Sequence, residues 1–243
     1  MKLIKLNAID STNDFLKGLS GNGTVDDFTV VVAEEQTKGR GQMGAQWVSE
    51  SGKNLTMSVL IKDLLIDINQ IFSLNALVSL SVLAALKQYN IPNLTIKWPN
   101  DIMSGNKKIG GVLIENSIKT SGDIISIVGI GLNVNQTQFE SLPKAASLSS
   151  IMGVQLDKEA LLLTLVSSLK ETVARYKTES FTDLWRTYNE IIFKKGIPMA
   201  FQFPNGTQFM GIIKEVDSFG KLRIVLENDT VVSFEIKQIQ MLY

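Results

Sequence analysis

The sequence predicts an α+β fold in which a mixed, mostly antiparallel sheet is flanked by helices and followed by a small β-rich unit. Strand-like runs succeed one another between residues 94 and 134 with only turn-length breaks, which indicates antiparallel or mixed pairing. Residues 68–89 and 156–178 have the length and apolar pattern of helices. From Gly196 onwards, short alternating strands are separated by turn residues.

The composition restricts the chemistry that the chain can perform. Its 243 residues suffice for one large domain or two unequal ones, and 44% apolar residues are enough for a sizeable core. Lys and Arg number 24, as do Asp and Glu, so no overall charge attracts nucleic acid or an anionic membrane. The chain has no Cys and no His, which excludes disulfides, thiolate metal sites and every mechanism that needs a histidine base.

The N-terminal residues carry no sign of export. Residues 1–7 are charged, and their apolar stretch is too short for a secretory signal. The uncharged run from Ile68 to Leu86 is interrupted by Asn, Gln and Ser, so a core helix is a better interpretation than a membrane span. We expect a soluble, cytoplasmic protein.

The first predicted elements are a short strand at 3–7 and a helix that begins just after it. Ser11, Thr12 and Asn13 precede the apolar stripe of this helix, and Ser11 or Thr12 suits its N-cap position. These side chains either cap the helix only or also hydrogen-bond a small polar ligand. Further strands are predicted at 29–34 and 55–62.

A glycine-rich loop at residues 36–47 joins the last two of these strands. Gly39, Gly41 and Gly44 let the backbone approach a ligand closely, and Arg40 adds a permanent, forked cation. This combination suits a phosphate or pyrophosphate. The loop joins strand to strand and lacks a Gly-Lys-Ser/Thr ending, which argues against a Walker loop and a Rossmann turn. The alternative is a surface loop that merely carries an arginine.

Polar residues follow the strand that begins at Leu94. Lys97 either faces solvent or places a charge on a carboxylate or α-phosphate, and Trp98 either supports a flat ligand or packs in the core. Asp101 could bind Mg²⁺, orient a proton-accepting group or cap the next turn. Asn133, further along the chain, could hold a ribose or phosphate oxygen or be a buried turn amide.

Two later strands are rich in glycine. Adjacent Gly110 and Gly111 interrupt the strand at 108–115, which indicates close approach by a ligand or by another backbone. The next strand, at 123–133, ends in a second glycine-containing run.

The C-terminal part of the chain differs from the rest in its pattern of predicted secondary structure. A helix is predicted at 181–190, after which about 48 residues of meandering strands look like a small SH3-like β-barrel. We therefore predict two domains, at 1–192 and 193–243.

Taken in order, these motifs closely resemble the biotin protein ligase family. The resemblance runs from about residue 3 to residue 135, and the later helices and terminal strands fit the layout of that family. The run at 97–101 and the Gly-Arg-Gly loop are highly specific as a pair. The motifs are Ser11-Thr12-Asn13, Gln36…Gly39-Arg40-Gly41…Gly44…Trp47, Lys97-Trp98-Pro99-Asn100-Asp101, Lys108-Ile109-Gly110-Gly111 and Gly129-Ile130-Gly131-Leu132-Asn133.

The resemblance implies a class II synthetase-like catalytic domain and a two-step ligase reaction. Such an enzyme makes biotinyl-5′-AMP and pyrophosphate from biotin and MgATP, then passes biotin to a lysine of a biotin carboxyl carrier protein. The substrate carboxylate attacks, so the absence of His and Cys is no obstacle. Lys97 and Arg40 would be the catalytic residues.

The resemblance also implies which residues touch each ligand. Those around biotin or biotinyl-AMP would be Ser11, Thr12, Asn13, Gln36, Gly39, Arg40, Gly41, Gln42, Trp47, Lys97, Gly110, Gly111, Gly129 and Gly131. Those near ATP and its phosphates would be Arg40, Lys97, Asn100, Asp101, Lys108 and Asn133, with Asp101 as the ligand of Mg²⁺.

Two departures from the family pattern affect these expectations. Many members carry an arginine where this chain has Gln42, which leaves one cation fewer near the phosphates. Some members begin with a DNA-binding domain, for which this chain leaves no room.

We expect no nucleic acid or membrane partner, and a homodimer is left open. The rival interpretations are a lipoate ligase on a related fold and a non-catalytic ligand-binding module, and the run at 97–101 favours biotin.

Overall fold

The computed structural model describes residues 2–22, 25–62, 64, 71–118, 122–139, 142–176 and 181–243. Its helices are α1 (Thr12–Asn22), η1 (Gln42–Gly44), α2 (Ile71–Gln88), α3 (Leu148–Met152), α4 (Lys158–Tyr176) and α5 (Phe181–Glu190). Its strands are β1 (Leu3–Ile9), β2 (Val30–Gln36), β3 (Leu55–Lys62), β4 (Leu94–Lys97), β5 (Asp101–Ser104), β6 (Lys107–Ile118), β7 (Ile124–Leu132), β8 (Pro198–Gln202), β9 (Gln208–Val216), β10 (Leu222–Leu226), β11 (Val231–Phe234) and β12 (Gln240–Leu242).

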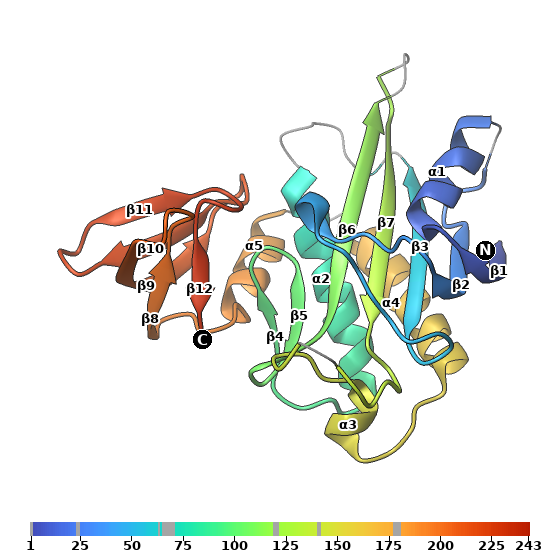
Figure 1. Ribbon diagram of the computed structural model, residues 1–243. Coiled ribbons are helices and arrows are strands. Elements are labelled where there is room, and N and C mark those ends of the chain that lie inside the picture. The colour runs from blue at the N-terminus through green and yellow to red at the C-terminus, as the bar shows by residue number, and fades with distance from the viewer. Residues whose placement is uncertain are drawn as a thin grey trace.

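A seven-stranded sheet in the order β1-β2-β3-β7-β6-β5-β4 forms the centre of the molecule (Figure 1). β1 runs parallel to β2, and the other neighbours are antiparallel. β3 and β7 are the central strands, and nearly all their residues are buried. The predicted mixed, mostly antiparallel sheet is therefore confirmed.

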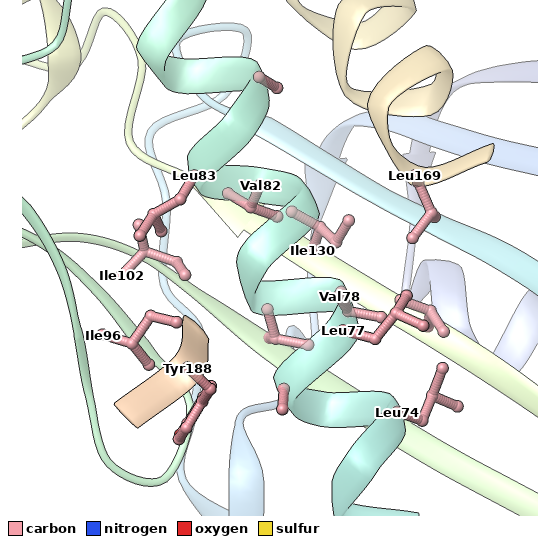
Figure 2. Packing of buried hydrophobic residues seen from close by; sticks show 14 of the residues in the cluster. Leu74, Leu77, Val78, Val82, Leu83, Ile96, Ile102, Ile130, Leu169 and Tyr188 are labelled. Carbon is pink, nitrogen blue, oxygen red and sulfur yellow. The ribbon is translucent and has the colours of Figure 1, made fainter. Parts of the chain in front are cut away.

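Helices cover both faces of this sheet. α2 and α4 lie on one face, where Leu77 and Val82 of α2 pack among strand residues such as Ile130 (Figure 2). α1 lies on the other face, where Leu16 packs against Val31 in a separate cluster. α1 begins directly after β1 and packs on β3 and β7. Its polar N-terminal residues therefore lie beside these central strands.

α2 is the one helix in the described ranges that is long and apolar enough to cross a membrane by length and composition. Within the fold, 72% of that stretch is buried. This burial agrees with the prediction of a core helix. Residues 68–70, where the predicted helix begins, lie outside the described residues, as do residues 177 and 178 at the predicted end of α4.

The C-terminal strands form a second, antiparallel sheet in the order β11-β10-β9-β8-β12. The four predicted strands are present, but β11 and β12 lie at the two edges of the sheet, so its strand pairings do not close the predicted barrel. Phe201 and Ile224 of this sheet belong to the same apolar cluster as α2. The second sheet is thus packed on the first unit through a continuous core.

The sequence analysis did not predict four short elements, which are β5, α3, β12 and the 3₁₀ turn η1 within the glycine-rich loop. The chain turns directly after Lys97 and returns as β5, so that Lys97 pairs with Asp101 in the register of a hairpin. Pro99 lies in this turn. α3 and β12 were missed because each is too short to show periodicity.

Candidate active site

A cavity of about 320 Å³ lies beneath the loop that joins β2 to β3. This loop crosses the face of the central sheet over β6 and β7 (Figure 1). Its other walls are the start of α1, the turn from β4 to β5 and one side of the C-terminal sheet. The predicted site residues that line it are Ser11, Thr12, Asn13, Gln36, Arg40, Gly41, Gln42, Trp47, Lys97, Asn100, Asp101, Lys108, Gly111, Gly129 and Gly131.

One end of the cavity carries a buried hydrogen-bond network. Thr12 donates from its backbone N and from Oγ1 to Oε1 of Gln36, over 2.8 and 2.9 Å. The Ser58 hydroxyl lies 2.7 Å from Thr12 Oγ1 and 2.6 Å from Asn13 Oδ1. Asn13 donates from Nδ2 to Oε2 of Glu115, over 2.8 Å. The start of α1 is thereby tied to β2, β3 and β6.

In this network one hydroxyl proton faces two oxygens. The Thr12 hydroxyl proton is directed to Gln36, so Thr12 Oγ1 can only accept from its other neighbours. Ser58 has a single hydroxyl proton for two acceptors, Thr12 Oγ1 and Asn13 Oδ1. The oxygen that Ser58 does not serve at a given moment can accept a hydrogen bond from a ligand. Since Thr12 and Asn13 line the cavity, a ligand that offers N–H groups would complete the network.

Ser11 combines the two roles that the sequence left open. Its Oγ accepts from the backbone N of Asp14 over 3.4 Å, which is the geometry of an N-cap. The predicted N-cap is therefore confirmed. Ser11 also lines the cavity, so its hydroxyl remains available to a ligand.

Two glycines of β7 make room beside this end of the cavity. A Cβ at Gly129 would lie 2.6 Å from Oδ1 of Asn13, and a Cβ at Gly131 would lie 2.6 Å from the Trp47 indole. Both distances are shorter than real Cβ contacts allow. Any side chain here would displace Asn13 or the loop.

Three predicted residues do not line this cavity. A Cβ at Gly110 would meet the Leu132 side chain at 2.4 Å, so this glycine serves the packing of β6 on β7. A Cβ at Gly39 would meet the loop's own backbone at 2.2 Å. Asn133 is buried and donates from Nδ2 to the carbonyl of Ala146 over 3.1 Å, which is the buried turn amide of the alternative interpretation.

Arg40 is held by carboxylates. Its Nη2 lies 2.5 Å from Oδ1 of Asp14 and 2.9 Å from Oε2 of Glu115. Both acids line a second hollow, whose other lining residues come mostly from the loop, and the Arg40 side chain is 43% exposed. In this conformation its charge is balanced by two acids, and contact with a phosphate would require it to leave them.

The start of the loop is anchored at the protein surface. Hydrogen bonds from Lys38 and then Thr37 hold the pKa of Asp10 below its usual value. The same contact with Asp10 raises the pKa of Lys38. Because these side chains are exposed, the contacts orient the start of the loop but contribute little to the free energy of folding.

The other end of the cavity carries two lysines around one carboxylate. Lys97 is 21% exposed, and its Nζ lies 3.2 Å from Oδ2 of Asp101. Nζ of Lys108 lies 2.5 Å from Oδ1 of the same acid. The Tyr243 ring lies 5.3 Å from Nζ of Lys97, and burial together with the charge of Asp101 raises the pKa of Tyr243. One acid for two cations leaves a net positive charge that favours an anion.

The turn between β4 and β5 is fixed from both sides. Trp98 is buried and donates from Nε1 to the carbonyl of Gly220 over 2.9 Å, so it both packs in the core and lines the cavity. Asn100 donates from Nδ2 to the carbonyl of Val112 over 2.6 Å. These contacts set the direction of Lys97.

The C-terminal sheet supplies a wall that the sequence analysis missed. Lys237 lines the cavity and donates from Nζ to the carbonyl of Met43, over 2.5 Å, so this unit touches the tip of the loop. The other lining residues from this unit are Phe201, Leu222, Ile236, Ile239, Gln240 and Met241.

The structure gives little support for a protein-held metal ion at Asp101. Each of its carboxylate oxygens already accepts a lysine ammonium group. Across the described part of the chain, no group of three or more Asp or Glu residues is arranged to hold a metal.

Ser58 and Glu115 were also missed. Thr56 and Ser58 are buried polar residues on one face of a strand that is otherwise apolar, and this alternation was the available signal. Glu115 gave no signal, because a charged residue at the end of an apolar run usually marks a solvated position.

The fold and cavity define a class of protein that encloses a small molecule with hydrogen-bond donors at one end and negative charge at the other. Residues 6–135 match the biotin/lipoate A/B protein ligase family. The chain belongs to this family.

Similar proteins extend the match beyond those residues. The bifunctional ligase/repressor BirA of Bacillus subtilis is 30% identical over 225 residues, covering 90% of this chain and 68% of that protein. The biotin–[acetyl-CoA-carboxylase] ligase of Paracoccus denitrificans is 30% identical over 231 residues, covering 88% and 90%. The biotin protein ligase of Aquifex aeolicus, solved with biotin and ATP, is 28% identical with a TM-score of 0.81, covering 99% and 98%.

Proposed function

We propose that this protein is a biotin protein ligase. It joins biotin to ATP, giving biotinyl-5′-AMP and pyrophosphate, and then transfers biotin to a lysine of a biotin carboxyl carrier protein. Both the named relatives and the solved ligase with biotin and ATP support this activity. The carrier belongs to a biotin-dependent carboxylase, as the name of the Paracoccus denitrificans relative implies.

The observation that carries the proposal is the polarity of the buried network. Thr12 and Asn13 present acceptor oxygens to the cavity, and Ser58 cannot serve both of them. The ureido ring of biotin offers two N–H donors, whereas the dithiolane ring of lipoate offers none. Leaving a buried acceptor unpaired costs about 1–3 kcal/mol, so the network favours biotin over lipoate.

The cationic end suits the first step. An oxygen of the biotin carboxylate attacks the α-phosphorus of ATP, and the bond to pyrophosphate breaks. Two anions must approach each other, and Lys97 offsets their repulsion while Lys108 adds charge beside it. Arg40 contributes once it leaves Asp14 and Glu115. Mg²⁺ enters with ATP as part of the substrate.

The second step needs a shielded intermediate. The amine of the carrier lysine attacks the acyl carbonyl of biotinyl-AMP, AMP leaves, and the amine loses a proton. The loop over the cavity excludes water from this hydrolysable anhydride. Trp47 against Gly131 and Lys237 against Met43 hold the loop in its closed position.

The remaining assignments follow from this function. Residues 1–192 form the catalytic domain and residues 193–243 an SH3-like unit. The protein acts in the cytoplasm. It has no nucleic acid or membrane partner, because its formal net charge is zero and no overall field attracts either one. Biotin lies against Ser11, Thr12, Asn13, Gln36, Trp47, Gly111, Gly129 and Gly131, and the ATP phosphates lie near Lys97, Asn100, Asp101 and Lys108.

One assay tests the activity. Biotin-dependent exchange of labelled pyrophosphate into ATP should be seen with Mg²⁺, and lipoate serves as the control substrate. Release of ADP, or equal exchange with lipoate, would contradict the proposal.

A further inference from the structure

Glu115 lies on β6, opposite Ile127 of β7, and belongs to none of the motifs recognised in the sequence. Its side chain is 22% exposed. Its carboxylate accepts from Asn13 Nδ2 over 2.8 Å and from Arg40 Nη2 over 2.9 and 3.1 Å. Glu115 therefore joins the buried network at the start of α1 to the glycine-rich loop.

The contact with Glu115 fixes which way the Asn13 amide points. A carboxylate paired with an arginine can only accept hydrogen bonds, so Asn13 must turn its NH₂ group towards it. The amide oxygen then faces Ser58 and the bare backbone of Gly129. The flipped amide would place oxygen against oxygen at a separation of 2.8 Å.

The orientation of this amide decides what the cavity can bind. With Oδ1 inward, Asn13 competes with Thr12 for the single Ser58 proton, and an acceptor is left for a ligand N–H. With NH₂ inward, Asn13 would donate to Ser58, and the competition between Asn13 and Thr12 for the Ser58 proton would disappear. An inward NH₂ would also oppose the N–H groups of a ureido ring.

The two contacts of Glu115 can be separated. Arg40 has a second acid partner in Asp14. Among the residues that the structure describes, Glu115 accepts the hydrogen bond from Asn13 Nδ2, and Asp14 does not. Asp14 is therefore a matched control, because it shares Arg40 with Glu115 and not Asn13.

We propose that Glu115 is a positioning residue that determines ring specificity: by holding the Asn13 amide oxygen inward, it tunes the cavity for a ligand ring that donates N–H groups. This inference rests on the proposed function and adds a residue to it. Glu115 acts through Asn13 and does not touch the reacting atoms.

The test compares steady-state pyrophosphate exchange by the full-length wild type, E115Q and D14N. Glutamine can donate as well as accept, so E115Q lets the Asn13 amide turn. We expect the KM for biotin to rise about tenfold in E115Q, while any change in kcat or in the KM for ATP that comes from a freed Arg40 should be shared by D14N. D14N should leave the KM for biotin within about twofold.

A double variant tests the mechanism by rescue. N13D alone sets two carboxylates against each other and should bind biotin weakly. In N13D/E115Q the introduced amide donates to the introduced carboxylate, whose second oxygen again faces the cavity. The KM for biotin should return to within about threefold of the wild type.

Three results would overturn the inference: an unchanged KM for biotin in E115Q, an equal rise in D14N, or a double variant no better than N13D. Thermal melts of every variant separate these results from a loss of folding. If the wild type shows no biotin-dependent exchange, the proposed function itself fails, and that result is distinct from all three.

Discussion

Replacing Lys97 with alanine separates the charge of this side chain from any role in folding. Lys97 and Asp101 are 3.2 Å apart, but Asp101 keeps Lys108 at 2.5 Å when Lys97 is removed. No buried carboxylate is stranded, so the variant loses one partly exposed ion pair and a contact with the Tyr243 ring. These interactions amount to about 1 kcal/mol, a small part of the stability of a domain.

The effect on activity should be much larger. Removal of a charged group that acts in the transition state costs about 3 kcal/mol, which is on the order of 10² to 10³ in rate. Biotin-dependent pyrophosphate exchange measures this loss, and urea unfolding measures stability. Lys158→Ala is the matched control, because Lys158 is 22% exposed and pairs with Glu34 at 2.5 Å. A folded Lys97→Ala variant with activity within about threefold of the wild type would refute the assignment.

Three further predictions concern the loop and the core. Gln42→Arg should slow the release of biotinyl-AMP about tenfold in stopped-flow experiments, because a charge-assisted hydrogen bond exceeds a neutral one by roughly 1 kcal/mol or more. Unchanged or faster release would show that the missing arginine is no deficit. Backbone amides at 37–53 should exchange hydrogen faster without ligand than with biotinyl-AMP, since glycines make ordering costly, and equal protection would mean a preformed loop. The Tyr188 hydroxyl is buried without a hydrogen-bond partner among the described residues, so Tyr188→Phe should stabilise the protein by about 1 kcal/mol in urea unfolding, and a loss of stability would contradict this reasoning. Burial raises the pKa of Tyr188, so wild-type stability should fall as the pH rises above the unfolded value of about 10, and this part of the fall should vanish in Tyr188→Phe.

The sequence by itself determined the local secondary-structure elements and the side-chain chemistry of the short motifs. The strand-like apolar runs of β3 and β7, the cap at Ser11 and the apolar pattern of α2 are local properties, and each predicted the element that is present. The order of the motifs was enough to indicate the family, because each motif is read along a few consecutive residues. Lys97 was singled out on the same basis, and it lines the cavity.

Tertiary structure alone decided which residues meet. Asn13 and Glu115 are 102 residues apart in the chain, and only the pairing of β6 with β7 beside α1 brings them together. The wall supplied by the C-terminal sheet is likewise invisible in a sequence read for local pattern. Gly110 packs strand against strand, and in the same sheet Gly129 opens space beside Asn13. The sequence cannot distinguish these two roles of a glycine. The role depends on the neighbouring residue across the sheet, and long-range strand pairing sets that neighbour.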